Sequence, residues 1–481
     1  MIFNSLQFAI FLPIVFAIYW LIPRSRLRAQ NLFLIAASYL FYGWWDYRFL
    51  SLILISSIID YTVGRRLFNT ADQRQRKSLL LISLISNLGI LGFFKYFNFF
   101  ADSTVRLFNA IGWTADALTL NVILPVGISF YTFQTLSYTI DIYRKKIPAT
   151  DDAIAFFAFV SFFPQLVAGP IERASNLLPQ FHRQRKFDLN QARDGMRQIL
   201  WGFIKKVVLA DTVGVQVDYI FSGYEFQDGF TLLLGLFLFN FQVYGDFSGY
   251  SDIAIGTARL FGFNLMTNFS YPLFSRNIVE YWRRWHISLS TWFRDYLYFP
   301  LGGSRVPKFR QALNIITTFT VSGLWHGASW HFVAWGFING VFFIPSIFLP
   351  KKTKTDSIVA ENRFLPSFFD MLRILRTNLL ISLSLVFLRS TTIDQAFGYL
   401  SRMGTDLGPS LLHPSLKPFL LLPLAHCALI LCIEWLNRRQ RHGLELSSRN
   451  LVLRWSVYFC GVIYFLMFGN FQERAFFYFQ F

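Results

Sequence analysis

Charged residues are scarce in this sequence. They make up 15% of its 481 residues, against roughly 25% in an ordinary soluble domain, whereas 54% of the residues are apolar and 19% are aromatic. This balance excludes a soluble globular protein. A membrane-crossing helix needs about 20 mainly apolar residues, and the chain offers roughly 11 to 13 spans or re-entrant helices, so we predict an all-α, polytopic helical membrane protein.

Cysteine is also rare, and repeats and linkers are missing. The three cysteines, Cys427, Cys432 and Cys460, are odd in number and lack the spacing of metal ligands. This excludes a disulfide framework and argues against a metal site. No internal repeat and no Gly/Ser-rich linker divides the chain. We therefore expect residues 1–481 to form one integral membrane domain.

The net charge of +18 does not indicate a nucleic-acid partner, because the basic residues form short clusters between apolar runs. Such clusters are typical of cytoplasmic loops beside membrane lipids. The run from Ile2 to Ile22 has no basic residue ahead of it and no cleavage pattern, so we expect it to remain as the first span. Arg24, Arg26 and Arg28 follow it, which places their loop in the cytoplasm and the N-terminus outside.

The apolar run 153–168 lies between two basic segments. Because both flanks have the character of cytoplasmic loops, we predict a re-entrant or interfacial segment here and not a full crossing.

Residues 271–310 carry many charged and aromatic side chains but contain no clean apolar span. Their central stretch, EYWRRWHISLSTWFRDYLYFPLGG, has an apolar stripe and a polar face at helical period. The stripe consists of Tyr281, Trp285, Leu289, Trp292 and Tyr296. This pattern predicts an amphipathic helix at the membrane interface, ended by Pro300 and the glycines at 302 and 303.

His326 lies in VSGLWHGASWHFVAWGFINGV, residues 321–341, among aliphatic, aromatic and small residues. Hydrocarbon around an imidazole disfavours its charged form, so the ring needs a partner or a function. Gly323 and Gly327 allow main chain or substrate to approach it closely. A neutral imidazole can take the proton of a hydroxyl that attacks an activated acyl carbon, whereas the alternative is a buried hydrogen bond between two helices. We interpret this stretch as a reaction centre within a membrane.

Six further histidines occupy different settings. His286 lies on the border between the two faces of the 271–310 helix, where it either contacts lipid headgroups or acts as a second active-site group. His331 follows His326 by five residues, about 140° round a helix, so we predict a structural role for it. We predict that His182 and His442 are solvated or lie near lipid headgroups. His413 and His426 have no partner that the sequence suggests.

Carboxylates within apolar runs are the other costly groups. In YGDFSGYSDIAIG, Asp246 and Asp252 could orient a histidine, face a polar substrate, or pair with Arg259 or Arg276. We favour a structural or cavity-lining role. Two acids nearer to basic loops are predicted to form ion pairs at the interface, Asp141 and Glu172.

Five strings spread along the chain resemble the membrane-bound O-acyltransferase family, and within it the branch that O-acetylates bacterial alginate, with teichoic acid D-alanyl transferases more distant. They are ILPVGISFYTFQTLSYTIDIYR (123–144), FPQLVAGPIER (163–173), YGDFSGYSDIAIG (244–256), EYWRRWHISLSTWFRDYLYFPLGG (280–303) and LWHGASWHFVAWG (324–336). The resemblance runs from the first span to the terminal FFYFQF and covers essentially the whole chain.

The resemblance implies a multi-helix fold with a membrane tunnel, in which an acyl group from a cytoplasmic donor meets its acceptor near the histidine of a WHG motif. That histidine is His326 here, and the second histidine of the family, in an RWH motif, falls on His286. We predict that both are catalytic. The residues predicted to bind substrate or line the cavity are Trp325, Gly327, Asp246, Asp252 and Arg284.

The partners of the reaction also follow from the resemblance. No bound cofactor is expected, and the acyl donor would be acetyl-CoA or another acyl thioester. In the alginate branch the acetyl group passes to a periplasmic acetyltransferase that completes transfer to polysaccharide hydroxyls. This implies a multi-pass protein of a bacterial inner (cytoplasmic) membrane with a polysaccharide acceptor.

The chain departs from the family at three positions. Members of this branch often carry a histidine where Asn339 stands, a different residue where His331 stands, and phenylalanine where Tyr281 stands.

Two other functions stay open. One alternative is transfer of a D-alanyl or other short acyl group to an envelope polymer. The other is a polysaccharide or proton-coupled solute transporter with Asp246 and Asp252 as the coupling acids.

Overall fold

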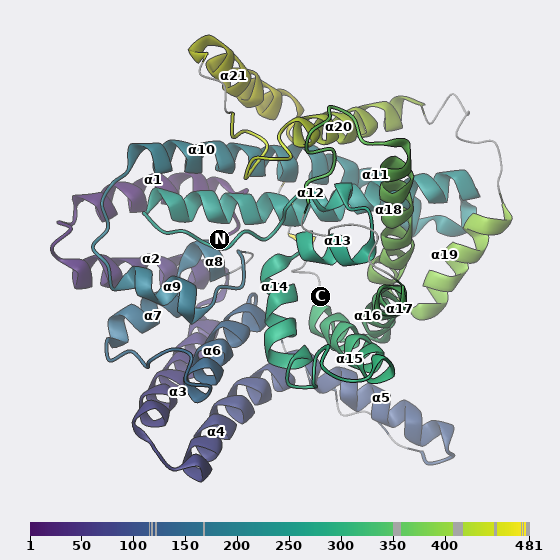
Figure 1. The fold of residues 1–481 in the computed structure, drawn as a ribbon. Coiled ribbons are helices and arrows are strands. Elements are labelled where there is room, and N and C mark those ends of the chain that lie inside the picture. The colour runs from purple at the N-terminus through teal and green to yellow at the C-terminus, as the bar shows by residue number, and fades with distance from the viewer. Residues whose placement is uncertain are drawn as a thin grey trace. The chain divides into compact units, whose positions relative to one another are not determined.

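The structure is a computed structural model of the chain, shown in Figure 1. It describes residues 1–481 apart from 115, 117–118, 121–122, 167–168, 350–356, 407–416, 447–449, 473, 475 and 478–481. The regular structure of the described residues is entirely helical, which confirms the predicted all-α class. They divide into two compact units, Met1–Ala192 with Ala258–Met266, and Arg193–Thr257 with Thr267–Phe481. The expectation of a single domain stays a prediction.

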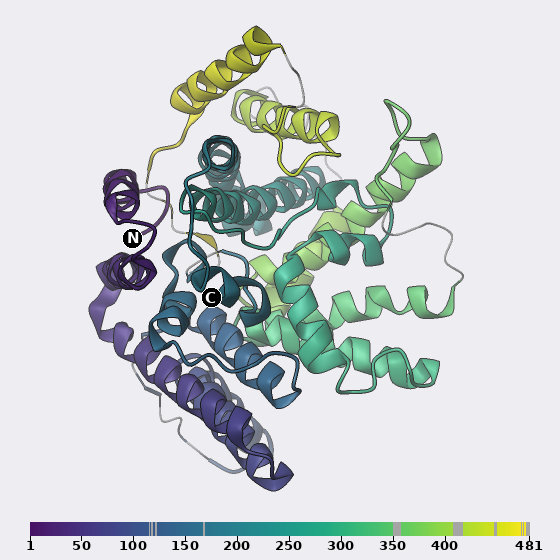
Figure 2. The same cartoon turned by 60° about the vertical axis from the view of Figure 1, so that its left-hand side comes forward.

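The first unit is built from helices joined by short turns. They are α1 (Leu6–Leu21), α2 (Leu27–Asp46), α3 (Leu50–Asn69), α4 (Gln73–Leu91), α5 (Phe97–Ala110), α6 (Ile128–Tyr143), α7 (Ala153–Ser161), α8 (Phe163–Leu166) and α9 (Ala174–Phe181). Helices α3 and α4 form a hairpin, and α6 packs against both (Figures 1 and 2). The predicted re-entrant run contains α7 and α8, which are too short to cross a bilayer.

A buried carboxylate joins α3, α4 and α6. Asp60 of α3 has no exposed surface. It accepts hydrogen bonds from the Ser83 hydroxyl, from Asn87 Nδ2 at 2.8 Å and from Thr139 Oγ1 at 3.0 Å. A carboxylate inside an apolar helix bundle needs such partners, and here neutral side chains on the two neighbouring helices supply them.

The second unit contains the remaining helices, of which α10 and α12 extend a few residues beyond its bounds. They are α10 (Leu189–Phe203), α11 (Asp211–Ser222), α12 (Gly229–Leu260), α13 (Ile278–Arg284), α14 (Ile287–Phe293), α15 (Lys308–His326), α16 (Trp330–Phe343), α17 (Pro345–Phe348), α18 (Phe368–Arg389), α19 (Ile393–Thr405), α20 (Lys417–Leu436) and α21 (Leu451–Phe468). Two π-helices, Ile204–Ala210 and Arg294–Tyr298, follow α10 and α14.

Adjacent lysines of the first π-helix bind the two acids of α12. Lys205 Nζ lies 2.6 Å from Asp252 Oδ2, and Lys206 Nζ lies 2.7 Å from Asp246 Oδ1 and 2.7 Å from Asp211 Oδ1. A π-helix has more residues per turn than an α-helix, so neighbouring side chains lie closer to one face. The sequence left pairing with Arg259 or Arg276 open as one of several alternatives, and it did not suggest these lysines as partners.

Glycines bring α12 close enough for these ion pairs. A Cβ atom on Gly249 would lie 2.8 Å from the main-chain oxygen of Gly202, and one on Gly245 would lie 2.9 Å from that of Lys205. Real Cβ atoms do not approach an oxygen so closely, so only glycine permits this packing. The string YGDFSGYSDIAIG therefore combines a glycine face with acidic anchors, which fits the favoured structural role of both acids.

Helices α15 and α16 pack just as tightly. A Cβ atom on Gly323 would clash with the main-chain oxygen of Phe332, and one on Gly336 would clash with that of Phe319. The crossing point of the two helices therefore needs glycine on both. Main chain fills the space beside Gly323, one of the two possibilities expected from the sequence.

Six helical stretches of the described chain are long and apolar enough to cross a membrane. They are Leu27–Asn69, Gln73–Ala110, Gly229–Leu260, Trp330–Phe348, Phe368–Arg389 and Leu451–Phe468. The first of them holds both α2 and α3, and two shorter apolar helices are Leu6–Leu21 and Leu420–Leu436. The chain is thus a multi-pass membrane protein. The roughly 11 to 13 predicted segments are more numerous than these stretches because that number also includes re-entrant and shorter helices.

The exchange Lys206→Met tests the buried ion pairs. Removing one partner of such a pair typically costs about 3–5 kcal/mol, because the other charge stays buried. We expect a clearly lower apparent Tm of the detergent-purified protein, measured by size exclusion after heating. The control is Lys77→Met on the exposed surface of α4, which should keep the wild-type Tm. Equal Tm values for the two variants would contradict the structural role of Lys206.

Candidate active site

His326 is the last residue of α15, where that helix ends against α16. Only 4% of the residue is exposed. Its ring centroid lies 5.0 Å from that of Trp325 and 5.0 Å from that of Trp335, with the planes nearly perpendicular. A Cβ atom on the following Gly327 would clash with the ring of Phe332. The WHG motif therefore places the imidazole among aromatic rings through close packing of the two helices.

His286 lies between α13 and α14. Trp285 is extended, with φ −103° and ψ 128°, and His286 is left-handed, with φ 43° and ψ 54°. The prediction of one continuous amphipathic helix is wrong here, because the helix stops at Arg284 and restarts at Ile287. A left-handed residue other than glycine costs roughly 1–2 kcal/mol, so the surrounding structure must hold it in place.

The predicted apolar stripe is largely buried despite this break. Its fully buried members are Tyr281, Trp285, Leu289 and Trp292. The chain turns after Pro300, where Gly302 and Gly303 have φ of 107° and 58°. Glycine adopts such angles without strain, so the predicted end of the region is confirmed.

The two histidines lie side by side. Their ring centroids are 6.3 Å apart, with the planes at 59°. Phe247 of α12 packs edge-on against His286 at 4.5 Å, and Trp325 lies 6.1 Å from it. Burial, and to a lesser degree the neighbouring His326, hold the pKa of His286 well below its ordinary value. The His286 ring is therefore neutral at physiological pH.

Both ring nitrogens of His286 lack a hydrogen-bond partner within the part of the chain that the structure describes. A neutral imidazole has one donor and one acceptor. Buried polar atoms in proteins are nearly always paired, and exceptions often have a catalytic role. The nitrogens of His286 can therefore bond to a substrate.

A cavity of about 590 Å³ borders both histidines, a size typical of small-molecule sites. Its wall combines aromatic side chains, among them Trp282 and Phe319, with polar groups from α13 to α15. The polar groups include Arg283, Ser290, Thr291, Arg294, Gln311 and Ser322. His326 is accordingly open to a chamber that could hold a reacting group.

The five residues predicted to bind substrate or line the cavity have different positions. Trp325 packs against both histidines, and Gly327 permits the close packing beside them. The other three are Asp246, Asp252 and Arg284. They form ion pairs within the helix packing and are not among the residues that line this cavity.

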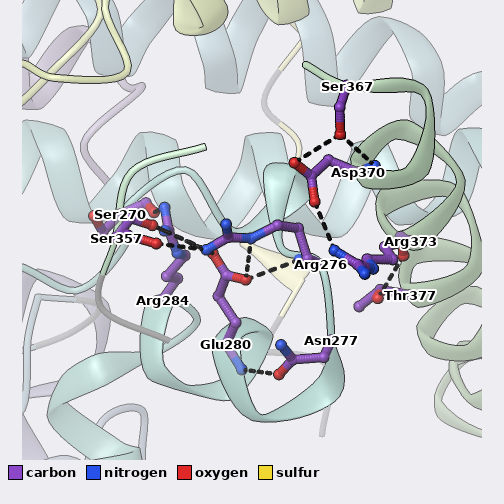
Figure 3. Close-up of polar contacts among 10 residues, drawn as sticks. All are labelled: Ser270, Arg276, Asn277, Glu280, Arg284, Ser357, Ser367, Asp370, Arg373 and Thr377. Atoms are coloured by element: carbon purple, nitrogen blue, oxygen red, sulfur yellow. Dashed lines mark hydrogen bonds and ion pairs between the residues drawn. The ribbon is translucent and has the colours of Figure 1, made fainter. Parts of the chain in front are cut away.

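Arg276 and Glu280, which are buried, form a cluster around α13 with the partly buried Arg284 (Figure 3). Glu280 binds Arg276 Nε at 3.0 Å and Arg284 Nη2 at 2.8 Å. Both guanidinium groups also donate to the main-chain oxygen of Ser357, at 3.1 and 3.0 Å. Asn277 caps the helix by accepting the Glu280 N–H at 2.9 Å. Both ends of the helix that leads to His286 are thus fixed.

The polar cavity residues were missed as site residues in the sequence. Arg283 and Arg294 belong to the polar half of the 281–297 pattern, which was interpreted as a face toward lipid headgroups. Gln311 and Ser322 belong to α15, and nothing in the sequence connects them with the RWH motif. The tertiary packing of the π-helix Arg294–Tyr298 against α15 brings the two groups together.

Two other histidines hold helices together. His331 Nδ1 lies 2.9 Å from the main-chain oxygen of Phe387 on α18, in agreement with the predicted structural role. His442 Nε2 lies 3.1 Å from Asp194 Oδ1, and only 2% of the residue is exposed. The predicted solvated or headgroup position of His442 is therefore wrong.

The remaining histidines lie away from the cavity lining. His182 is exposed, with Nε2 3.2 Å from Thr150 Oγ1. His426 bonds through Nδ1 to the hydroxyl of Tyr464. His413 lies outside the described residues.

Both of the predicted interfacial acids are buried, but only one forms the predicted ion pair. Asp141 lies 3.8 Å from Lys146 Nζ, as predicted. Glu172 instead is 1% exposed and accepts hydrogen bonds from Asn176 Nδ2 at 2.7 Å and from the main-chain N–H of Met266. Burial raises the pKa of Glu172 to about 7, so its prediction as an interfacial ion pair is wrong.

The sequence match to a known family covers most of the chain. A family model described as MBOAT, membrane-bound O-acyltransferase family, matches residues 49–385. This chain belongs to the membrane-bound O-acyltransferase family. The two histidines that border the cavity both fall within the matched residues, as does the whole segment between them.

Relatives of this chain have names of three kinds. The probable alginate O-acetylase AlgI of Pseudomonas aeruginosa is 43% identical over 332 residues, 68% of this chain and 62% of that protein. The peptidoglycan O-acetyltransferase of Helicobacter pylori is 32% identical over 444 residues, 86% of this chain and 82% of that protein. The teichoic acid D-alanyltransferase of Streptococcus thermophilus is 30% identical over 243 residues, 48% of this chain and 58% of that protein. The match spans less than two thirds of the P. aeruginosa protein.

The neutral state of buried His286 makes stability depend on pH. Below about pH 6.5 an unfolded histidine binds a proton, whereas the lowered pKa keeps the folded residue neutral. The unfolded state then binds more protons, so the free energy of unfolding falls as the pH drops. We expect the apparent Tm to fall between about pH 7 and 5 by more in wild type than in His286→Asn, because asparagine does not titrate and tolerates a left-handed backbone.

The matched control for this comparison is His182→Asn at an exposed position. It should keep the wild-type pH dependence of the apparent Tm. If His286→Asn lost stability with acid as steeply as wild type, His286 would not be the neutral buried group described above.

Proposed function

We propose that this protein is an O-acyltransferase that passes an acetyl group from a cytoplasmic activated thioester donor across the membrane, for the O-acetylation of an exported polysaccharide. The observation that carries the proposal is the pair of buried histidines, with ring centroids 6.3 Å apart, on one cavity of about 590 Å³. The similarity to proteins named alginate O-acetylase and peptidoglycan O-acetyltransferase supports an acetyl group and a polysaccharide acceptor.

In the proposed reaction His326 is the general base. Its neutral imidazole takes the proton of the attacking hydroxyl while the hydroxyl oxygen bonds to the thioester carbonyl carbon. The carbon–sulfur bond then breaks, and the departing thiolate takes the proton from the imidazolium. The products are an O-acetyl ester and a free thiol, and His326 returns to its neutral form.

The proposed role of His286 is to donate one hydrogen bond to the thioester carbonyl oxygen. Negative charge develops on that oxygen as the hydroxyl attacks, and a donor fixed in a site without water stabilises it strongly. A ring that stays neutral keeps one N–H and does not repel a protonated His326. Its unpartnered nitrogens among the described residues support this role.

The donor is proposed to be acetyl-CoA or another acyl thioester from the cytoplasm. Arg283 and Arg294 border the cavity, and guanidinium groups suit the phosphates that such donors carry. We propose a bacterial inner membrane location with the N-terminus outside, which the basic loop after the first helix supports. A periplasmic acetyltransferase would then receive the acetyl group and complete its transfer to the polysaccharide.

A second candidate is transfer of a D-alanyl group to an envelope polymer. The similarity to a teichoic acid D-alanyltransferase favours it, and mass spectrometry of the modified polymer distinguishes D-alanyl from acetyl esters. A proton-coupled transporter has less support, because Asp246 and Asp252 are ion-paired to lysines within the helix packing.

The exchange His326→Ala tests the proposed general base. Loss of such a group typically lowers the rate about 100- to 10,000-fold. Acetyl transfer from labelled acetyl-CoA to the polysaccharide, measured in membranes of cells that lack the native enzyme, should therefore become nearly undetectable. Equal amounts of folded protein are confirmed by size exclusion in detergent.

The matched control is His182→Ala, which removes an exposed histidine far along the chain from the cavity residues. It should transfer acetyl groups at the wild-type rate. Wild-type transfer by His326→Ala itself would remove that residue from the mechanism.

A further inference from the structure

The left-handed main chain at His286 is clasped by residues 268–270. The main-chain N–H of Ser270 donates to the oxygen of Arg284 at 3.0 Å, before the break. The N–H of Ile287 donates to the oxygen of Asn268 at 2.9 Å, just after it. The two residues of the break, Trp285 and His286, therefore lie between two cross-chain hydrogen bonds.

The Asn268 side chain extends this clasp to another helix. Its Oδ1 accepts the Ser288 hydroxyl at 3.0 Å and the Ser288 N–H at 3.4 Å, at the start of α14. Its Nδ2 donates to Ser251 Oγ of α12 at 3.0 Å. Both Asn268 and Ser288 have no exposed surface, and Ser251 has 2%. One buried amide thus joins the first turn of α14 to α12.

The break carries strain that these bonds can hold. The φ of 43° at His286 lies in the left-handed region, which residues other than glycine rarely adopt. Such residues persist only where their surroundings fix the backbone. Arg284, at one end of the clasp, is itself held by Glu280 (Figure 3). At the other end, the Asn268 amide accepts hydrogen bonds from the first turn of α14.

We propose that Asn268 is a positioning residue, which holds His286 in its left-handed conformation and so keeps the imidazole facing His326 and the cavity. The inference rests on the proposed function for its effect on turnover, but not for its effect on the ring. An asparagine is suited to the task because its amide donates to one helix and accepts from another at once. Alanine at this position would remove the side-chain hydrogen bonds to Ser251 and Ser288, and with them the tie between α12 and the start of α14.

The test compares Asn268→Ala with Asn240→Ala. Asn240 is a matched control, because its buried Nδ2 also donates to a serine hydroxyl on another helix, Ser382, at 3.0 Å. Each variant loses a buried amide bond to a serine hydroxyl, and Asn268→Ala also loses the two bonds that Oδ1 accepts from Ser288. Only Asn268→Ala should lower kcat, by about 10- to 100-fold as expected for a misplaced catalytic group, with the KM for acetyl-CoA unchanged.

A second readout does not depend on acyl transfer. Diethyl pyrocarbonate modifies neutral imidazoles, and mass spectrometry gives the rate at His286 relative to that at the exposed His182 in the same protein. We expect this ratio to change in Asn268→Ala and to stay at the wild-type value in Asn240→Ala. If wild type itself transfers no acyl group, the proposed function fails while this ratio still tests the positioning role.

Two results would overturn the inference. One is an unchanged modification ratio at His286 in Asn268→Ala. The other is a fall in kcat that is the same in Asn268→Ala and Asn240→Ala at equal amounts of folded protein, because that would reflect general destabilisation.

Discussion

Two neighbouring imidazoles buried among aromatic rings place demands on all the structure around them. His286 and His326 are 2% and 4% exposed, so water cannot stabilise a charge on either ring, and two charged rings side by side would repel each other. The pair therefore works only while at least one ring stays neutral. Burial supplies this condition for His286 by lowering its pKa, and it requires helices packed closely enough to exclude water.

Each unusual local feature near the cavity contributes to that packing. Gly323 and Gly336 let α15 and α16 touch through their main chains, which brings Trp335 against His326. The left-handed backbone at His286 ends one helix and starts another, so its ring reaches the same cavity. In a regular helix through 281–297, residue 286 would follow residue 285 at about 100° round the axis, and neither the extended Trp285 nor the left-handed His286 would exist.

Two groups of buried charges in the second unit are compensated by partners of opposite sign. Lys205 and Lys206 neutralise acids of α12, and Glu280 neutralises Arg276 and Arg284. Such buried pairs add little net stability over apolar residues of similar volume, but removing one member is costly. We infer that their contribution is to fix which helix faces meet, and thereby the geometry of the cavity.

The sequence predicted those features that depend on local pattern or on the cost of burial. Helical class, the apolar stripe, the turn at Gly302 and the apolar surroundings of His326 follow from periodicity, backbone freedom and the composition around the residue. The break at His286 did not, because helical period continues through it. The partners of Asp246 and the burial of His442 depend on residues more than thirty positions away, and no local signal encodes them.

The most direct measurement of the proposed site is a cryo-EM structure with a thioether analogue of acetyl-CoA that cannot transfer its acetyl group. The account predicts the acetyl carbonyl in the cavity, within about 3–4 Å of His326. An analogue bound elsewhere, with both histidines out of its reach, would contradict it.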